Sequence, residues 1–189
     1  MFKLYFPYSG QLETVRCFDD DMLLNQLGEA IGLCQALHEA GGGSKLLCVR
    51  QWRGYEGFVL LHLRRLQTEV MLRDLEYWDV NDIYSPYLLA WRRLTKKGIH
   101  QAPRPPRWIG GLWFLHSNRS ELIRVRPEVY AQQFPTTPLE MPFLWPQNIP
   151  GHFDYYIDMS LGDRMAVTDR KYVIPEQFAE YVYAKEKMA

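Results

Sequence analysis

The nine residues from His116 to Arg124 combine side-chain types that bind anions. They hold two arginines, one histidine and three small polar residues, in the order His-Ser-Asn-Arg-Ser-Glu-Leu-Ile-Arg. Guanidinium groups form paired hydrogen bonds with phosphate, and the first N–H groups of a helix attract negative charge. The block predicts that Arg119 and Arg124 bind phosphate, with a solvated helix face as the alternative. His116 is either a pocket group or a core histidine, and the core position is slightly favoured.

Basic residues gather around this block, although the 189-residue chain has no net formal charge. Residues 90–126 hold nine lysines and arginines against Glu121 alone, a balance of +8, with tryptophans between them. Residues 1–40 are acidic, with a balance of −4. Zero net charge disfavours a protein that coats nucleic acid without specificity, whereas a basic face with interleaved aromatic rings favours contact with phosphates. A solvated basic surface is the alternative interpretation.

Several other kinds of site and location are disfavoured by the sequence. The three cysteines show no C-x-x-C spacing and the histidines are scattered, so we expect free thiols in a reducing cytoplasm and no metal or organic cofactor. The sequence contains no run of about 18 apolar residues, so no membrane span is predicted. The first residues do not resemble a signal peptide, and no Walker loop, dinucleotide fingerprint or hydrolase elbow occurs.

The elements that must position these residues are mostly helices. An aspartate in Asp19–Asp21 is expected to cap a helix that runs to about residue 39. Its apolar residues recur at helical spacing, at Leu23, Leu27, Ala30, Cys34 and Leu37. A longer helix is predicted over about 47–76, with Gly54 and Gly57 weakening its first turns.

The rest of the chain alternates helices with irregular segments. Residues 1–18 are predicted to be extended, with a turn at Pro7–Gly10. Prolines make 102–107 extended and punctuate a coil from Pro135 to Pro150. Further helices are predicted at 87–97 after a turn at 81–86, from about 117–120 to before 127, and at 175–187. The predicted fold is mostly α: a single compact helical domain over 1–146, with long irregular connections and a C-terminal extension over 147–189 packed on it.

Three ordered blocks carry a family resemblance. The first is Phe6-Pro7-Tyr8 together with the helix that contains Gln26-Leu-Gly-Glu29-Ala30. The second is Val49-Arg-Gln-Trp-Arg-Gly-Tyr-Glu56. The third is Ser117-Asn-Arg-Ser120, followed by Pro127-Glu-Val-Tyr130, Phe134-Pro135 and Trp145-Pro146. Over residues 2–146 this ordered set resembles the pyrimidine-dimer DNA glycosylase family, typified by the phage endonuclease-V-type enzyme, and most closely a bacterial branch of it.

The resemblance implies a base-excision repair enzyme whose partner is DNA that carries a damaged or modified pyrimidine. In such an enzyme the α-amine of the first residue attacks C1′, expels the base and forms a Schiff base, and elimination then nicks the strand. The resemblance assigns these roles to Met1 as nucleophile and Glu29 as acid/base. An α-amine titrates near about pH 7.7–8.0, so part of it is neutral and nucleophilic, while a carboxylate stabilises the cation and moves protons.

The residue types of the second and third blocks suggest which side chains surround the substrate. Trp52, Arg53, Tyr55 and Glu56 would line the pocket, with Arg53 on a phosphate and Tyr55 stacked on a flipped base. Packing at a helix start is the alternative for these four residues. Asn118 and Ser120 would join the two arginines of the third block, and the DNA would contact the 90–126 basic face.

The sequence departs from the family around the first long helix. Leu27 and Gly28 stand where the family carries arginine, and Asn118 replaces a histidine. Two alternatives to the DNA glycosylase therefore remain open. One is a non-catalytic module that binds nucleic acid or nucleotides on the same scaffold, and the other is an enzyme that acts on a hypermodified base or a nucleoside.

Overall fold

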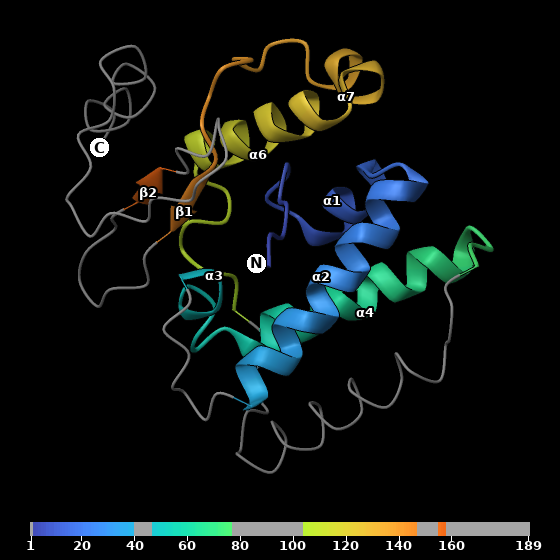
Figure 1. Ribbon diagram of the computed structural model, residues 1–189, viewed down its shortest axis with the longest axis vertical. Coiled ribbons are helices and arrows are strands. Elements are labelled where there is room, and N and C mark those ends of the chain that lie inside the picture. The colour runs from blue at the N-terminus through green and yellow to red at the C-terminus, as the bar shows by residue number, and fades with distance from the viewer. Residues whose placement is uncertain (1, 40–46, 77–103, 147–154, 158–189) are drawn as a thin grey trace. The chain divides into compact units, whose positions relative to one another are not determined.

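The computed structural model describes residues 2–39, 47–76, 104–146 and 155–157 (Figure 1). In chain order its elements are α1 (Gln11–Cys17), α2 (Asp20–Glu39), α3 (Leu47–Arg50), α4 (Glu56–Leu72), α6 (Leu112–Val125), α7 (Pro127–Gln133), β1 (Leu144–Pro146) and β2 (Tyr155–Ile157). The described residues are mostly helical, which confirms the predicted fold class. The turn predicted at 81–86 and the helices predicted at 87–97 and 175–187 lie outside these residues.

The chain divides into two compact units, Met1–Arg107 and Trp108–Ala189. This division falls inside the range 1–146, for which the sequence predicts one domain. The predicted boundary between residues 146 and 147 stays a prediction, because most of the proposed extension lies outside the described residues. Among the helices of the described ranges, none is long and apolar enough to cross a membrane.

The first unit is built on α2 and α4, which pack side by side (Figure 1). The side chain of Asp19 caps α2, because its Oδ1 accepts the N–H of Met22 at 2.8 Å. The predicted apolar stripe is buried at Leu23, Leu27, Ala30 and Cys34 and half-buried at its last residue, Leu37. Both the predicted cap and the predicted core face of this helix are therefore confirmed.

Helix α1 corrects the prediction of an extended segment through residue 18. Its Gln11 side chain donates from Nε2 to the carbonyl oxygen of Phe58 on α4 at 3.0 Å, and Thr14 Oγ1 donates to the carbonyl oxygen of Tyr8 at 3.1 Å. Thr14 and Val15 are fully buried. A helix of seven residues carries little stability of its own, so its contact with α4 through Gln11 and the burial of Thr14 and Val15 decide its conformation.

The single helix predicted over 47–76 is wrong at residues 51–55, where a turn separates α3 from α4. Gly54 adopts φ +81°, a left-handed conformation that a residue with a Cβ enters only with strain. The N–H of Tyr55 donates to the carbonyl oxygen of Trp52 at 3.0 Å and closes the turn. The glycine therefore ends one helix and starts another, rather than weakening a continuous one.

The core of the first unit contains a cluster of rings. Phe6 lies 4.4 Å from His62, 5.6 Å from Trp52 and 5.7 Å from Phe58, measured between ring centroids. His62 and Phe58 are one turn apart on α4, and Trp52 comes from the turn before it. Phe6 is thus anchored beside α4, directly after the first five residues of the chain.

The second unit packs α6 against α7, beside a two-stranded antiparallel sheet in which Trp145 pairs with Tyr156. Helix α6 ends before Pro127 as predicted, but it begins at Leu112, earlier than the predicted start at 117–120. Helix α7 was not predicted, although Pro127 at its first turn is a common helix start. Strand β1 lies within the predicted coil, because its pairing with β2, which follows in the sequence, is not revealed by the local proline pattern.

Candidate active site

Glu29 and Gln26 lie on the part of α2 that holds the first residues of the chain. The Oε2 atom of Glu29 accepts the backbone N–H of Lys3 at 2.9 Å. Gln26 binds the same segment twice, since its Oε1 accepts the N–H of Tyr5 at 2.7 Å and its Nε2 donates to the carbonyl oxygen of Lys3 at 3.0 Å. The backbone N–H and C=O groups of an extended segment usually bond to a neighbouring strand. Here two side chains of α2 supply those hydrogen-bond partners instead.

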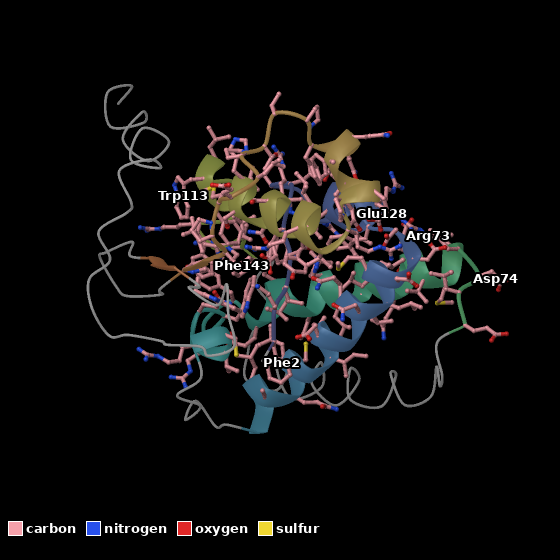
Figure 2. All side chains as sticks on the ribbon, turned by 45° about the horizontal axis from the view of Figure 1, so that its top comes forward. Phe2, Arg73, Asp74, Trp113, Glu128 and Phe143 are labelled. Carbon is pink, nitrogen blue, oxygen red and sulfur yellow. The ribbon has the colours of Figure 1, made fainter. Side chains whose placement is uncertain are left out.

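The first residues run antiparallel to α2, because their partners occur in reverse order along the helix. Tyr5 binds Gln26, Lys3 binds Glu29, and Phe2 contacts Gly32. Gly32 leaves room for this approach: a Cβ at that position would lie 2.4 Å from Cε1 of Phe2. Figure 2 shows Phe2 beside α2. Met1, the proposed nucleophile, lies outside the described residues.

The chemistry of this arrangement comes from a carboxylate beside the start of the chain. Glu29 is half-buried, so it is neither a freely solvated surface group nor a sealed core residue. A carboxylate in this setting stabilises a nearby positive charge and exchanges protons with groups within hydrogen-bond reach. The neighbouring Gln26 is fully buried and carries no charge, so it contributes position rather than acid–base chemistry.

The second predicted block, Trp52 to Glu56, forms the turn between α3 and α4. Trp52 is only 2% exposed and belongs to the ring cluster, so packing accounts for its position. Glu56 accepts the N–H of Gly54 at 3.0 Å on its Oε1 and thereby stabilises the turn. Arg53 and Tyr55 are half-buried in the same turn. The substrate roles predicted for this block, those of Trp52, Arg53, Tyr55 and Glu56, all stay predictions.

The third predicted block lies on α6, and its small polar residues bind backbone atoms of their own unit. Asn118 donates from Nδ2 to the carbonyl oxygen of Phe114 at 2.8 Å, and Ser120 Oγ donates to that of Leu139 at 2.9 Å. Ser117 Oγ accepts the N–H of Leu144 at 3.2 Å. All three polar residues are fully buried. The two serines fasten the segment that contains Leu139 and Leu144 to α6, whereas the Asn118 bond lies within α6, and the substrate roles of Asn118 and Ser120 stay predictions.

The arginines and the histidine of this block are more exposed than its small polar residues. Arg124 forms an ion pair with Glu121 one turn earlier, and the guanidinium carbon of Arg119 lies 5.3 Å from the ring centroid of Phe134. His116 is half-buried, and burial, followed by the charge of Arg119, lowers its pKa below the ordinary value. His116 is therefore mainly neutral near pH 7, which adds no positive charge to an anion site.

The predicted site residues thus fall into two sets. Glu29 and the Trp52–Glu56 turn belong to the first unit, and His116–Arg124 belongs to the second. Residues 90–103, the first part of the predicted basic face, lie outside the described residues. Across the described ranges, no three histidine, cysteine, aspartate or glutamate residues gather as a metal site would require. Within the described residues, Cys17, Cys34 and Cys48 form no disulfide.

Two notable residues have no role in the sequence-based prediction. Gln26 stands three positions before Glu29 on the same flank of the helix. This spacing is the feature of the sequence that indicates that the two side chains face the same segment. His62 stands between Leu61 and Leu63 on a strongly apolar helix, a pattern that indicates a core position. The sequence could reveal that both residues are buried, but not which backbone atoms or rings they contact.

Comparison with known proteins adds no family to this picture. No protein-family model matches the chain, and no curated protein or solved structure is significantly similar to it.

Proposed function

We propose that this protein is a DNA glycosylase, with abasic-site lyase activity, that excises a damaged or modified pyrimidine through a Schiff base at its N-terminal amine. Glu29 is the proposed acid/base and Met1 the proposed nucleophile. The observation that carries the proposal is the 2.9 Å hydrogen bond between Glu29 Oε2 and the N–H of Lys3. It holds a carboxylate two residues from the proposed nucleophile.

The hydrogen bond of Lys3 to Glu29 supports this pair of residues. The proposed nucleophile is two residues earlier in the sequence, and each residue spans at most about 3.6 Å. A nucleophile and its acid/base partner need such proximity before substrate binding brings them into contact. The resemblance to the pyrimidine-dimer glycosylases supports the same pair of residues.

The proposed reaction proceeds in balanced steps. The neutral amine of Met1 attacks C1′, and the bond to the base breaks with its electron pair, so the base leaves and takes up a proton. The amine has then lost one proton and keeps the other. Glu29 delivers a proton to the ring oxygen as the C1′–O bond breaks, and the nitrogen lone pair forms a protonated iminium with C1′. Removal of a proton from C2′ expels the 3′ phosphate, and water finally hydrolyses the imine. Glu29 stabilises the positive charge of the iminium throughout.

Borohydride trapping tests the proposal directly. The protein is incubated with duplex DNA that contains an abasic site or a pyrimidine dimer, and borohydride reduces the iminium to a stable amine. We expect a covalent protein–DNA adduct, mapped by mass spectrometry to Met1. Glu29→Gln should lower the trapping rate by at least about 100-fold, since one general acid–base group contributes about 10²–10⁴-fold.

The matched control is Glu76→Gln, which removes a carboxylate from an exposed position of the same unit. This variant should trap DNA at the parent rate. Absence of any adduct with damaged, abasic and single-stranded DNA would sink the amine mechanism. An adduct on a lysine rather than on Met1 would do the same for the assigned nucleophile.

A second candidate is an enzyme that acts on a modified base or a free nucleoside. The observation that favours it is the charge of α2, which begins with the exposed acids Asp20 and Asp21 and contains no lysine or arginine. An acidic helix beside the reactive carboxylate repels a polyanion. Turnover of a nucleoside with no dependence on salt would support this candidate. A DNA affinity that falls steeply with salt, and less steeply in Arg119→Ala and Arg124→Ala, would support the DNA enzyme instead.

A further inference from the structure

Gln26 uses both ends of its amide to hold the backbone at the start of the chain. Its oxygen accepts the N–H of Tyr5 at 2.7 Å, and its nitrogen donates to the carbonyl oxygen of Lys3 at 3.0 Å. The side chain is fully buried, so water does not compete for these bonds. A buried glutamine that pairs with a neighbouring segment in this way fixes that segment in one register.

Two further positions of α2 extend this contact in steps of three residues. Glu29 binds the N–H of Lys3, and Gly32 receives the ring of Phe2 at a distance that leaves no room for a Cβ. The backbone of residues 2–5 is therefore held by two side chains and by one close approach. Sliding the segment by one residue would break three hydrogen bonds and drive a side chain into Gly32.

We propose that Gln26 is a positioning residue for the Schiff-base reaction, which fixes the first residues so that the Met1 amine is presented to Glu29 and to C1′. This inference rests on the proposed function. A nucleophile that is misplaced by about 1 Å loses about 10²-fold in rate, so the anchoring of Lys3 and Tyr5 bears directly on catalysis. Gln26 touches neither the substrate nor the reacting atoms and acts only through the backbone that it holds.

The first test replaces Gln26 with methionine, which has a similar length but forms neither hydrogen bond. We expect Gln26→Met to lower the single-turnover rate of trapping at least tenfold, with little change in the KM for DNA. Gln35→Met is the matched control, because Gln35 is an exposed glutamine on the same helix. It should trap at the parent rate, which excludes a general effect of methionine on α2.

A second measurement, amide hydrogen exchange, reports on the hydrogen bonds that hold residues 2–5 and does not depend on activity. The amides of Lys3 and Tyr5 donate to Glu29 and Gln26, so we expect them to exchange slowly with solvent in the parent protein. Gln26→Met should speed the exchange of both amides at least tenfold, while Gln35→Met leaves it unchanged. Gln26→Glu retains an acceptor for Tyr5 but loses the donor to Lys3, so it separates the two hydrogen bonds.

A third variant distinguishes an effect on positioning from a general loss of folding. Gly32→Ala favours the helix by about 1 kcal/mol in intrinsic propensity, yet its Cβ displaces the ring of Phe2. We expect slower trapping at undiminished thermal stability. Phe2→Leu in the same chain removes the Cε1 atom that collides, and it should restore part of the rate.

The outcomes separate this inference from the function on which it rests. Slower trapping together with faster amide exchange in Gln26→Met supports the positioning role. Faster exchange with unchanged trapping overturns that role and leaves the glycosylase standing. If the parent traps no DNA although its amides are protected, the proposed function fails and the positioning role fails with it, while the anchor remains as a structural feature only.

Discussion

The imidazole ring of His62 lies against the ring of Phe6, with 4.4 Å between their centroids. His62 is fully buried, and within the described part of the chain neither ring nitrogen has a hydrogen-bond partner. Burial, followed by the charge of Arg65, lowers the pKa of His62 to about 3. The histidine therefore serves as a neutral aromatic spacer between α4 and the anchored first segment.

This pKa predicts that the free energy of unfolding depends on pH. The folded state holds His62 neutral, whereas the unfolded chain takes up its proton near pH 6.5. The contribution of this residue is fully present above pH 6.5 and is lost as the pH falls from 6.5 toward 3, by about 1.4 kcal/mol per pH unit. Urea unfolding at several pH values measures this slope.

The control for this prediction is His62→Leu, which replaces the buried imidazole with an apolar side chain. Because the two ring nitrogens have no hydrogen bonds to lose within the described residues, we expect a stability near pH 7 within about 1.5 kcal/mol of the parent. The decline below pH 6.5 should become shallower by the contribution of one histidine. An unchanged slope in His62→Leu would contradict the assignment.

Arg73 is predicted to be a main stabilising residue of the first unit. Its guanidinium donates to the carbonyl oxygens of Phe18 at 2.7 Å and Arg16 at 3.2 Å, and it pairs with Asp20 and Glu69 at 3.1 Å each. It thus joins the C-terminal end of α4 to the end of α1 and the start of α2, and Figure 2 marks its position. A lysine cannot reproduce this planar set of donors.

We expect Arg73→Lys to lower the free energy of unfolding by about 1–3 kcal/mol, measured by chemical denaturation. The comparison is Arg64→Lys, at an exposed position of the same helix, which should change stability by less than about 0.5 kcal/mol. Equal effects of the two substitutions would show that the contacts of Arg73 contribute little.

Ser120 provides a test of structural against substrate-binding roles. Its hydroxyl donates to the carbonyl oxygen of Leu139, and the side chain is fully buried. We expect Ser120→Ala to destabilise the protein by about 1–2 kcal/mol without changing DNA affinity under conditions where it stays folded. Ser9→Ala, at an exposed position, serves as the control. If folded Ser120→Ala protein binds DNA more weakly than the parent, Ser120 contributes to substrate binding.

The cysteines should differ strongly in reactivity. Burial raises the pKa of the Cys34 thiol to about 12, and Cys48 is also buried, whereas Cys17 is half-buried. The thiolate is the reactive form, so we expect an alkylating agent at pH 8 to modify Cys17 first in the native protein. Mass spectrometry after timed quenching measures the order. All three should react in denaturant, and rapid labelling of Cys34 in the native protein would contradict its burial.

Helix α2 shows which parts of the fold the sequence predicts well. Its cap at Asp19 and its buried stripe at Leu23, Leu27, Ala30 and Cys34 were predicted from local patterns and are confirmed. A cap depends on atoms within three residues, and a stripe depends on helical periodicity, so neither needs knowledge of distant segments. The mostly α fold class follows from the same kind of local information.

Elements that depend on distant partners were predicted less well. Helix α1 is decided by contacts such as that of Gln11 with Phe58, which is 47 positions away. The break at Gly54 depends on its backbone conformation, since a glycine is also tolerated within a helix at modest cost. In the second unit, Ser117 and Asn118 have side chains suited to an anion site, but their hydrogen bonds go to backbone atoms.

The sequence by itself determined the helical class and the start and core face of α2, while the roles that it assigns to Glu29 and Met1 stay predictions. Only the tertiary structure decided that Glu29 binds the N–H of Lys3, 26 positions earlier, and that Gln26 holds Lys3 and Tyr5 in place. The physical reason is that a hydrogen bond between distant segments depends on how helices and loops pack. A local pattern records only which atoms are able to form such a bond.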